Sequence, residues 1–266
     1  MKKTLIVGNW KMNLKPQQAS VLLARLQKAI EGHRDIEVVL APSLLTLQPL
    51  SLQIDRRRFR LAAQNAYHKD EGAYTGEVSF AMLDDLVHYV IIGHSERRIY
   101  FDEDLKTVQN KVTACVRNGL TPLLCIGESA QERRAGETKQ VLHDQVVTAL
   151  SGLTAEEVGE MVIAYEPVWA ISTFGGELAK PGQVKTAMDF IRRQVSELYG
   201  KKAGEDIRIL YGGSVDEQVV GGYLEVEGCD GTLVGGASLN AHKFAGIVES
   251  AYKLKMKKSS DGKKED

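Results

Sequence analysis

Short apolar runs alternate with longer, helically patterned segments along most of the chain. Several of these runs are close to continuous and rich in β-branched residues, which is typical of a strand buried on both faces of a parallel sheet. The eight runs are Leu5–Val7, Ile36–Leu40, Arg60–Ala63, Tyr89–Ile92, Pro122–Ile126, Met161–Ala164, Ile207–Leu210 and Thr232–Val234.

The segments between these runs repeat apolar residues at helical spacing. One stripe, which ends before Gly200, comprises Val184, Met188, Ile191, Val195 and Leu198. A second, which ends before Gly119, comprises Leu105, Val108, Val112, Cys115 and Val116. A third comprises Phe244, Ile247, Val248 and Ala251. A glycine directly after such a stripe is suited to the left-handed cap of a helix.

Eight strands with interleaved helices place the chain in the α/β class and predict a (β/α)8 barrel. An open Rossmann sheet should carry G-x-G-x-x-G after an early strand, and the sequence has none. No linker rich in Pro, Gly or Ser divides the chain, so residues 1–256 are predicted to form one barrel domain. Residues 257–266, KKSSDGKKED, hold seven charges and no apolar residue, and we expect this tail to be disordered.

Composition excludes several classes of protein. The 34 basic and 35 acidic residues give a net charge of −1, which argues against nucleic-acid binding and gives no support for attachment to a membrane surface. No apolar run approaches the roughly 18–20 residues that span a bilayer. The three cysteines form no CxxC pair and the six histidines show no ligand spacing, so neither disulfides nor a metal are expected. A reduced, cytoplasmic protein is the resulting expectation.

In a barrel of this type, active groups belong in the loops after the carboxyl ends of the strands. Two glycine pairs follow the last two strands: Gly212 and Gly213, with Ser214 behind them, and Gly235 and Gly236. Glycine allows backbone N–H groups to approach an anion closely. Either pair alone is consistent with an ordinary tight turn, whereas both together favour a phosphate site.

Other unusual residues fall on the same rim. Glu166 ends a buried run, and a carboxylate in an apolar site that can close is suited to general base catalysis. His94 precedes a short helix that Ser95 could cap, and the positive end of a helix keeps an imidazole neutral. Lys11 could neutralise an anionic substrate, with Asn9 orienting it. The alternatives are a solvated Glu, a packed or capping His and a solvent-facing Lys.

Motifs along nearly the whole chain, roughly residues 4–252, occur in the order found in the triosephosphate isomerase family, which the sequence resembles. They are GNWKMN at 8–13, QN at 64–65, GAYTGE at 72–77, GHSERR at 93–98, CIGE at 125–128, AYEPVWAI at 164–171, YGGSV at 211–215 and the LVGGA segment.

The resemblance implies an aldose–ketose isomerase of glycolysis and gluconeogenesis that interconverts dihydroxyacetone phosphate and D-glyceraldehyde 3-phosphate without a cofactor. By motif, Glu166 is the base that moves the carbon-bound proton and His94 is the neutral electrophile. Lys11 and Asn9 stabilise charge that develops on oxygen. Preorganised donors of this kind lower the barrier to an enediolate intermediate.

The resemblance also assigns supporting positions. Phosphate would be held by Ser172, Gly213, Ser214, Gly235 and Gly236. Glu96 would lie beside Lys11 and His94, and Tyr211 would latch a lid over the substrate. A surface ion pair between Glu96 and Arg98 is the competing interpretation. Cys125 and Glu128 are assigned to packing and helix capping.

One segment departs from the family pattern. STFGGELAKPGQ, from Ser172 to Gln183, places Ser where the family has Gly and lengthens the lid by about two residues. The Gly175–Gly176 pair could shift its flexible point.

Two competing hypotheses about function stay open: a barrel isomerase for another sugar phosphate, and a catalytically weak barrel kept as a binding or scaffold protein because of its altered lid. A homodimer is expected, because the GAYTGE loop reaches into the partner in relatives.

Overall fold

The computed structural model describes residues 2–174 and 177–261, with secondary structure alone for 258–261. Among these residues, eight parallel strands pair in chain order and close into a barrel. They are β1 (Thr4–Asn9), β2 (Ile36–Ala41), β3 (Phe59–Ala63), β4 (Tyr89–Ile92), β5 (Thr121–Ile126), β6 (Val162–Tyr165), β7 (Arg208–Tyr211) and β8 (Gly231–Val234). The predicted (β/α)8 barrel is confirmed, and every predicted strand lies within two residues of an observed one.

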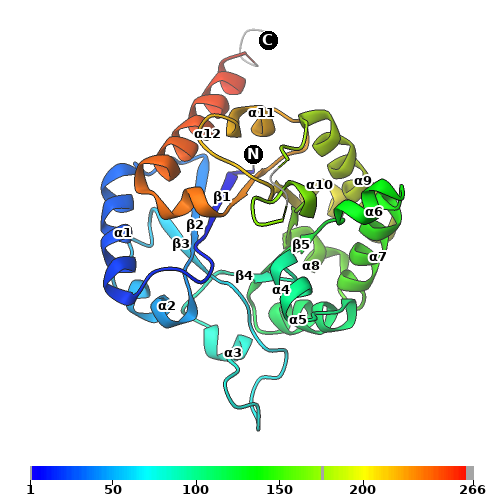
Figure 1. Ribbon diagram of the computed structural model, residues 1–266, viewed down its shortest axis with the longest axis horizontal. Coiled ribbons are helices and arrows are strands. Elements are labelled where there is room, and N and C mark those ends of the chain that lie inside the picture. The colour runs from blue at the N-terminus through cyan, green and yellow to red at the C-terminus, as the bar shows by residue number, and fades with distance from the viewer. Residues whose placement is uncertain (1, 175–176, 262–266) are drawn as a thin grey trace.

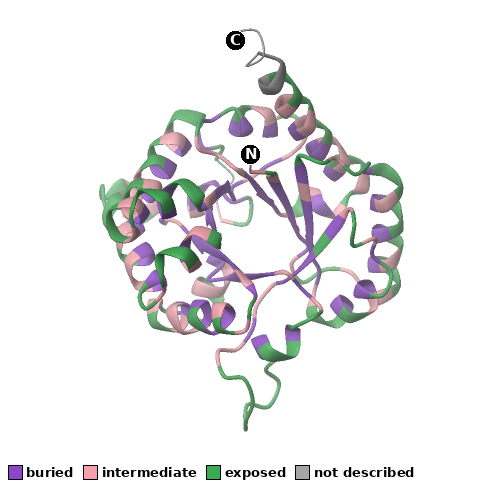
Figure 2. Cartoon of the chain, turned by 180° about the vertical axis from the view of Figure 1, so that it is seen from behind, coloured by how far each residue is buried: buried purple, intermediate pink, exposed green. Residues whose placement is uncertain are grey.

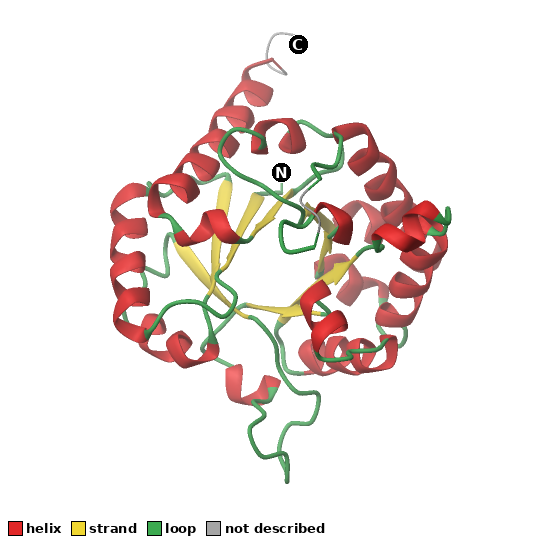
Figure 3. Cartoon of the chain, viewed as in Figure 1, coloured by secondary structure: helices red, strands yellow, loops and turns green. Residues whose placement is uncertain are grey.

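Helices form a ring around the strands (Figures 1 and 3). Their bounds are α1 (Pro16–Ala29), α2 (Leu44–Ser51), α3 (Phe80–Leu83), α4 (Ser95–Tyr100), α5 (Leu105–Arg117), α6 (Ala130–Arg134), α7 (Thr138–Leu150), α8 (Ala155–Glu160), α9 (Pro181–Tyr199), α10 (Lys201–Asp206), α11 (Val220–Leu224) and α12 (Ala241–Asp261), with 3₁₀ turns η1 (Val168–Ala170) and η2 (Gly236–Leu239). All three predicted helical stripes lie on helices. Leu198 is the exception within its stripe, because it lies near the end of α9 and is exposed.

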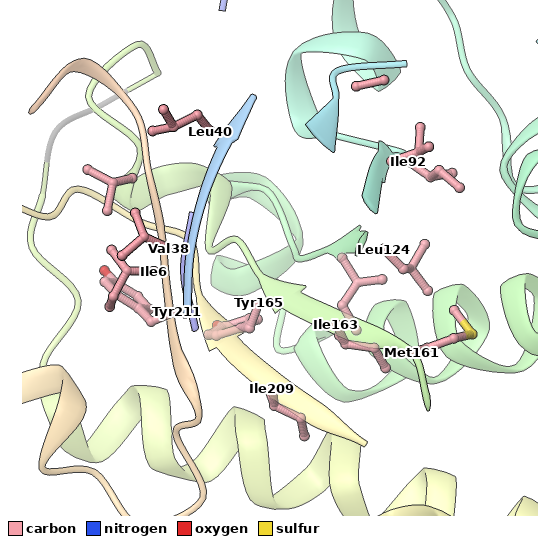
Figure 4. Close-up of a cluster of buried hydrophobic side chains, with 14 of the residues drawn as sticks. Ile6, Val38, Leu40, Ile92, Leu124, Met161, Ile163, Tyr165, Ile209 and Tyr211 are labelled. Carbon is pink, nitrogen blue, oxygen red and sulfur yellow. The ribbon is translucent and has the colours of Figure 1, made fainter. Parts of the chain in front are cut away.

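The core has two layers, because successive side chains of a strand point to opposite faces. Leu5 and Val7 belong to a cluster inside the barrel, whereas Ile6 packs between the strands and the helices. Figure 4 shows part of this outer layer, with labelled side chains from β1, β2, β4, β5, β6 and β7. Buried residues accordingly concentrate on the strands and on the inner faces of the helices (Figure 2).

Glycine is required where the barrel closes. Gly231 begins β8, and a Cβ atom there would lie 1.9 Å from the carbonyl oxygen of Leu5 on β1. The first and last strands then pair in parallel from Leu5 with Gly231 to Gly8 with Val234. Closure therefore depends on the absence of a side chain at residue 231.

The last helix extends into the segment that we expect to be a tail. α12 ends at Asp261, while 262–266 lie outside the described residues. The division into a barrel at 1–256 and a disordered tail at 257–266 therefore stays a prediction. No helix within the described part of the chain is long and apolar enough to cross a membrane.

Candidate active site

The barrel gathers the predicted polar residues around one cavity of about 490 Å³ at the carboxyl ends of the strands. Parallel strands in a closed barrel all end on this rim, so loops that are far apart in sequence meet there. The predicted residues that line the cavity are Asn9, Lys11, His94, Glu166, Ser172, Gly213, Ser214, Gly235 and Gly236.

Lys11 is held in an unusual backbone conformation directly after β1. Its φ of +52° lies in the left-handed region, which costs a non-glycine residue about 1–3 kcal/mol. Asn9 Oδ1 accepts a hydrogen bond from the Lys11 amide at 3.0 Å, and Gln64 Nε2 donates to the Lys11 carbonyl at 2.9 Å. The ammonium group contacts Glu96 Oε1 at 2.5 Å. Asn9 thus orients the Lys11 backbone, and Glu96 orients its charge.

His94 caps helix α4. Its Nδ1 accepts from the Glu96 amide at 3.2 Å, so the cap is His94 itself and not Ser95 as predicted. An Nδ1 that accepts carries no proton, and the proton of this tautomer lies on Nε2. Nε2 lies 3.1 Å from Glu166 Oε1, where an N–H donates well to a carboxylate. The geometry therefore presents a neutral imidazole as a donor into the cavity.

Glu166 follows β6 directly and is almost fully buried. Besides the contact with His94, its Oε2 accepts a hydrogen bond from the Ser95 amide at 3.1 Å. A Cβ atom at Gly212 would lie 2.7 Å from Glu166 Cγ, so glycine at 212 makes room for the carboxylate. The glycine pair after β7 therefore serves the candidate base as well as the predicted phosphate site.

The loops after β7 and β8 line the same cavity as Lys11. The Ser214 amide donates to the Ala170 carbonyl at 3.1 Å, and its hydroxyl lies 3.2 Å from that of Ser172. This contact joins the β7 loop to the first residue of the lid. A Cβ atom at Gly235 would lie 3.5 Å from Lys11 Cε, whereas Gly236 has open space around it. The two glycines thus leave the backbone beside Lys11 accessible.

Residues 4–251 match the family described as Triosephosphate isomerase. The chain belongs to the triosephosphate isomerase family. The relative from Citrifermentans bemidjiense named Triosephosphate isomerase is 44% identical over 249 residues, covering 93% of this chain and 98% of the relative. Relatives of the same name from Syntrophotalea carbinolica and from Dehalococcoides mccartyi strain BAV1 are 43% and 40% identical, covering 94% and 97% of this chain and 98% and 100% of the relatives.

In this member of the triosephosphate isomerase family, Tyr211 lies behind the cavity wall and does not line it. Its ring stacks on Tyr223 with centroids 4.0 Å apart, and burial raises the pKa of its hydroxyl. The Tyr223 hydroxyl donates to the carbonyl of Ala179, near the end of the lid, at 2.8 Å. Sequence reasoning missed Tyr223, because it lies on α11 with no motif to mark it. The Gly175–Gly176 pair lies outside the described residues.

Glu96 and Arg98 bind different partners rather than each other. Glu96 pairs with Lys11, and its Oε1 also accepts from Thr173 at 3.4 Å. Arg98 donates to the carbonyls of Gly93 and Cys125 at 2.8 and 3.1 Å. The contact with Thr173 links Glu96 to the described start of the lid, a connection that the sequence did not reveal.

Glu128 is fully buried and does not line the cavity. Its carboxylate accepts from Tyr165 at 3.1 Å, Trp169 Nε1 at 3.0 Å and Arg133 at 3.3 Å. It makes no cap: helix α6 is capped by Ser129, which corrects the predicted capping role of Glu128. Within the described residues, no group of three or more His, Cys, Asp or Glu side chains is placed to hold a metal ion.

Proposed function

We propose that this chain interconverts dihydroxyacetone phosphate and D-glyceraldehyde 3-phosphate. The observation that carries the proposal is the 3.1 Å contact between Glu166 and a neutral, donating His94 in a cavity that Lys11 also lines. The family match and the names of the relatives support the same reaction. Neither supports the alternative of a catalytically weak scaffold.

The reaction requires a base that reaches carbon and donors that reach oxygen. The Glu166 carboxylate takes a proton from the carbon beside the carbonyl, and the C–H electron pair forms the C–C double bond of the enediolate. The His94 Nε2–H and the Lys11 ammonium stabilise the negative oxygen. The protonated Glu166 then returns the proton to the former carbonyl carbon, and the hydroxyl proton passes from one enediolate oxygen to the other beside His94 Nε2. The two proton shifts balance within the substrate, so no cofactor is consumed. Glu166 must exchange its contacts with Ser95 and His94 for the substrate before this step.

Phosphate binding is assigned to the loops after β7 and β8 together with Ser172. The backbone beside Gly235 and Gly236 is open to an anion, and η2 begins at Gly236. The Ser214 amide would exchange the Ala170 carbonyl for a phosphate oxygen. The negative ligand would then lie close to Lys11 and offset part of its charge.

A coupled assay with D-glyceraldehyde 3-phosphate as the substrate tests this function. Turnover that saturates with substrate is the expected result. Wild-type protein that binds the triose phosphate without turnover would overturn the isomerase and favour the scaffold. A preference for a larger sugar phosphate would favour the other barrel isomerase.

The lid between Ser172 and Lys180 is proposed to close over the substrate with altered dynamics. Its described ends are held by Ser214 and Tyr223, as the site contacts show. Shortening the loop to the family length should change both kcat and the relaxation rate of the lid measured by NMR. Unchanged values of both quantities would contradict the proposal.

We propose that the protein is a homodimer. Residues 64–79 form a loop that projects from the barrel between β3 and α3 (Figure 1). Beside Lys11 and Glu96 lies a recess of about 340 Å³, with exposed Met12 and Phe101 on its wall. A projecting loop and an apolar recess on one molecule suit a two-fold pair that exchanges loops. Sedimentation at micromolar concentration should show twice the 29.3 kDa chain mass, and a monomer alone would contradict this.

The cellular setting follows from the reaction. We propose that the protein is cytoplasmic and works in glycolysis and gluconeogenesis, since the substrates are the triose phosphates of those pathways. Fractionation of cells of the source organism should recover the isomerase activity with the cytoplasmic fraction.

A further inference from the structure

A second large recess lies at the opposite end of the barrel, where the first three strands begin. Its volume is about 690 Å³, and its wall includes residues just before β1, at the start of β2 and at the start of β3. We call this cavity the basic recess, because its wall carries the basic residues Lys3, Arg34, Arg56, Arg57, Arg58 and Arg60. The chain as a whole carries a net charge of −1, so this concentration of positive charge is local.

Two acidic groups near the basic recess, Asp55 and Glu37, are already bound, whereas Asp35 beside Arg34 is exposed to solvent. Asp55 accepts from Arg58 Nε at 2.9 Å and from the Arg57 amide at 3.0 Å. Glu37, on the recess wall, accepts from the Tyr89 hydroxyl at 2.8 Å and from Arg208 at 2.9 Å. These carboxylates are therefore engaged by neighbours and leave much of the positive charge on the wall uncompensated.

Three of the arginines are held by contacts within the chain, and one of these, Arg56, donates to the Asp85 carbonyl at 3.2 Å. Arg58 donates to the carbonyls of Gln27 and Ile30 at 2.9 and 3.1 Å, where α1 ends. A Cβ atom at Gly32 would lie 3.0 Å from Arg58 Cγ, so the chain approaches this side chain closely. Arg60 Nη1 donates to His88 Nε2 at 2.7 Å. Because a guanidinium has five donors, this bond leaves Arg60 with N–H groups for a ligand.

Three cations on the wall are free. Within the described residues, the side chains of Lys3, Arg34 and Arg57 make no hydrogen bond or ion pair with the rest of the chain. They extend from three separate segments, so the charge surrounds the recess instead of lying along one helix. A ligand that satisfies all three must carry several negative charges close together.

We propose that the basic recess binds an oligophosphate anion, meaning two or more linked phosphate groups. Guanidinium groups match phosphate oxygens in a two-pronged geometry, and charge-assisted bonds of this kind are the strong ones. The volume of the recess falls within the range of small-ligand sites, roughly 300–1,000 Å³. A single phosphate carries too little charge for three free cations, whereas the linked phosphates of tripolyphosphate or of a nucleoside triphosphate match them.

Calorimetry with inorganic tripolyphosphate tests the site, with dihydroxyacetone phosphate present to occupy the catalytic cavity. We expect one ligand per chain. The double variant Arg34→Gln/Arg57→Gln should weaken binding by about tenfold or more, since two charge-assisted contacts with the ligand are lost. Isomerase activity should stay unchanged, because neither side chain touches the catalytic cavity.

The matched control removes two exposed cations elsewhere. Arg25 lies on α1 and Lys139 on α7, and neither lines the basic recess. The control variant Arg25→Gln/Lys139→Gln should change the affinity for tripolyphosphate less than twofold. Equal losses in the two double variants would overturn the proposal, because the effect would then be one of net charge.

Three further results bear on the class of ligand. Tripolyphosphate binding that is as tight in Arg34→Gln/Arg57→Gln as in the wild type would overturn the site. Orthophosphate that binds as tightly as tripolyphosphate would overturn the requirement for linked phosphates. A DNA duplex that displaces tripolyphosphate at equal phosphate concentration would assign the face to nucleic acid instead. Tighter binding of ATP supports a nucleotide ligand, and equal binding supports the inorganic chain.

Discussion

Two glutamates follow neighbouring strands of the barrel and have almost the same burial, yet they serve different ends. Glu128 follows β5 and is 0% exposed, whereas Glu166 follows β6 and is 2% exposed. Three side chains donate to Glu128, and it lines no part of the cavity. Glu166 is held by one amide and one imidazole and faces the cavity.

Burial alone therefore does not mark a catalytic carboxylate. The charge of Glu128 is satisfied by Tyr165, Trp169 and Arg133, and a ligand could displace these contacts only by unpacking the core. Glu166 has different neighbours: His94 takes part in the reaction itself, and the Ser95 amide is a donor that substrate can replace. A carboxylate can move a proton only when part of its surroundings can be replaced by substrate.

The largest expected effect comes from Glu166→Gln. The amide cannot accept a proton from carbon, so kcat should fall by about 10²–10⁴-fold, as for the loss of a general base. The free energy of unfolding should fall by less than in Glu128→Gln, since the new Gln side chain lines the cavity and can turn its NH₂ group toward it. Steady-state kinetics and urea denaturation measure the two quantities, and a kcat near that of the wild type would refute the assignment.

Glu128→Gln should lower the stability of the fold more than it lowers kcat. The NH₂ group of the new Gln side chain would face the Trp169 N–H or the Tyr165 hydroxyl. The donor that it faces would lose its acceptor and stay buried without a hydrogen-bond partner. We expect the free energy of unfolding to fall by about 1–3 kcal/mol. The change in kcat should stay far below that of Glu166→Gln. A variant that is fully stable but inactive would place Glu128 in the reaction and remove the contrast.

A third variant tests whether backbone placement matters at Lys11. Gln64→Met removes the donor to the Lys11 carbonyl, and the strained φ of +52° loses one of its supports. We expect kcat to fall by about tenfold with a smaller change in KM, since a lost hydrogen bond contributes about 0.5–1.5 kcal/mol.

The control for Gln64 is an exposed glutamine that also donates to a carbonyl. Gln53 follows α2, donates to the Pro49 carbonyl at 3.0 Å and lines no part of the catalytic cavity. Gln53→Met should leave kcat and KM unchanged. A loss confined to stability in Gln64→Met would show that the contact supports the fold alone.

The smallest effect concerns His88, a half-buried histidine whose Nε2 accepts from Arg60. Burial first, and then Arg60 and Arg56, lower its pKa below 6.5 in the folded protein. The unfolded chain binds the proton more readily, so the stability from this group is complete above pH 6.5 and is lost as pH falls through the folded pKa. His88→Gln should reduce the loss of unfolding free energy between pH 7.5 and pH 5. Parallel pH curves for the two proteins would exclude this linkage.

The sequence predicted the barrel and its rim because both depend on local signals. Continuous apolar runs mark the strands, and paired glycines mark loops that must leave room for a ligand. Contacts between distant segments leave no such mark. Lys111 is buried on the predicted apolar face of α5, where it pairs with Glu103 and binds Asn65 at 2.7 Å.

The same limit explains the errors near the site. Ser95 is the better capping residue by type, but the turn after β4 brings the His94 ring onto the Glu96 amide. Tyr223 and Gln64 act through carbonyl groups, which every residue has, so even the QN motif at 64–65 does not show what Gln64 binds. Chemical type predicts which residues face the cavity better than it predicts what holds them.

The closure of the barrel at Gly231 has a consequence for how the protein is made. Leu5 and Gly231 pair although 226 positions separate them, so this seam has the largest sequence separation in the sheet. Contacts of such long range form late and slowly. Lys11 and Gly235 flank the two strands that join there, and a nascent chain acquires its anion site only when synthesis has passed residue 236. Isomerase activity therefore reports that the whole barrel has folded, because a fragment that lacks either terminal strand lacks one wall of the cavity.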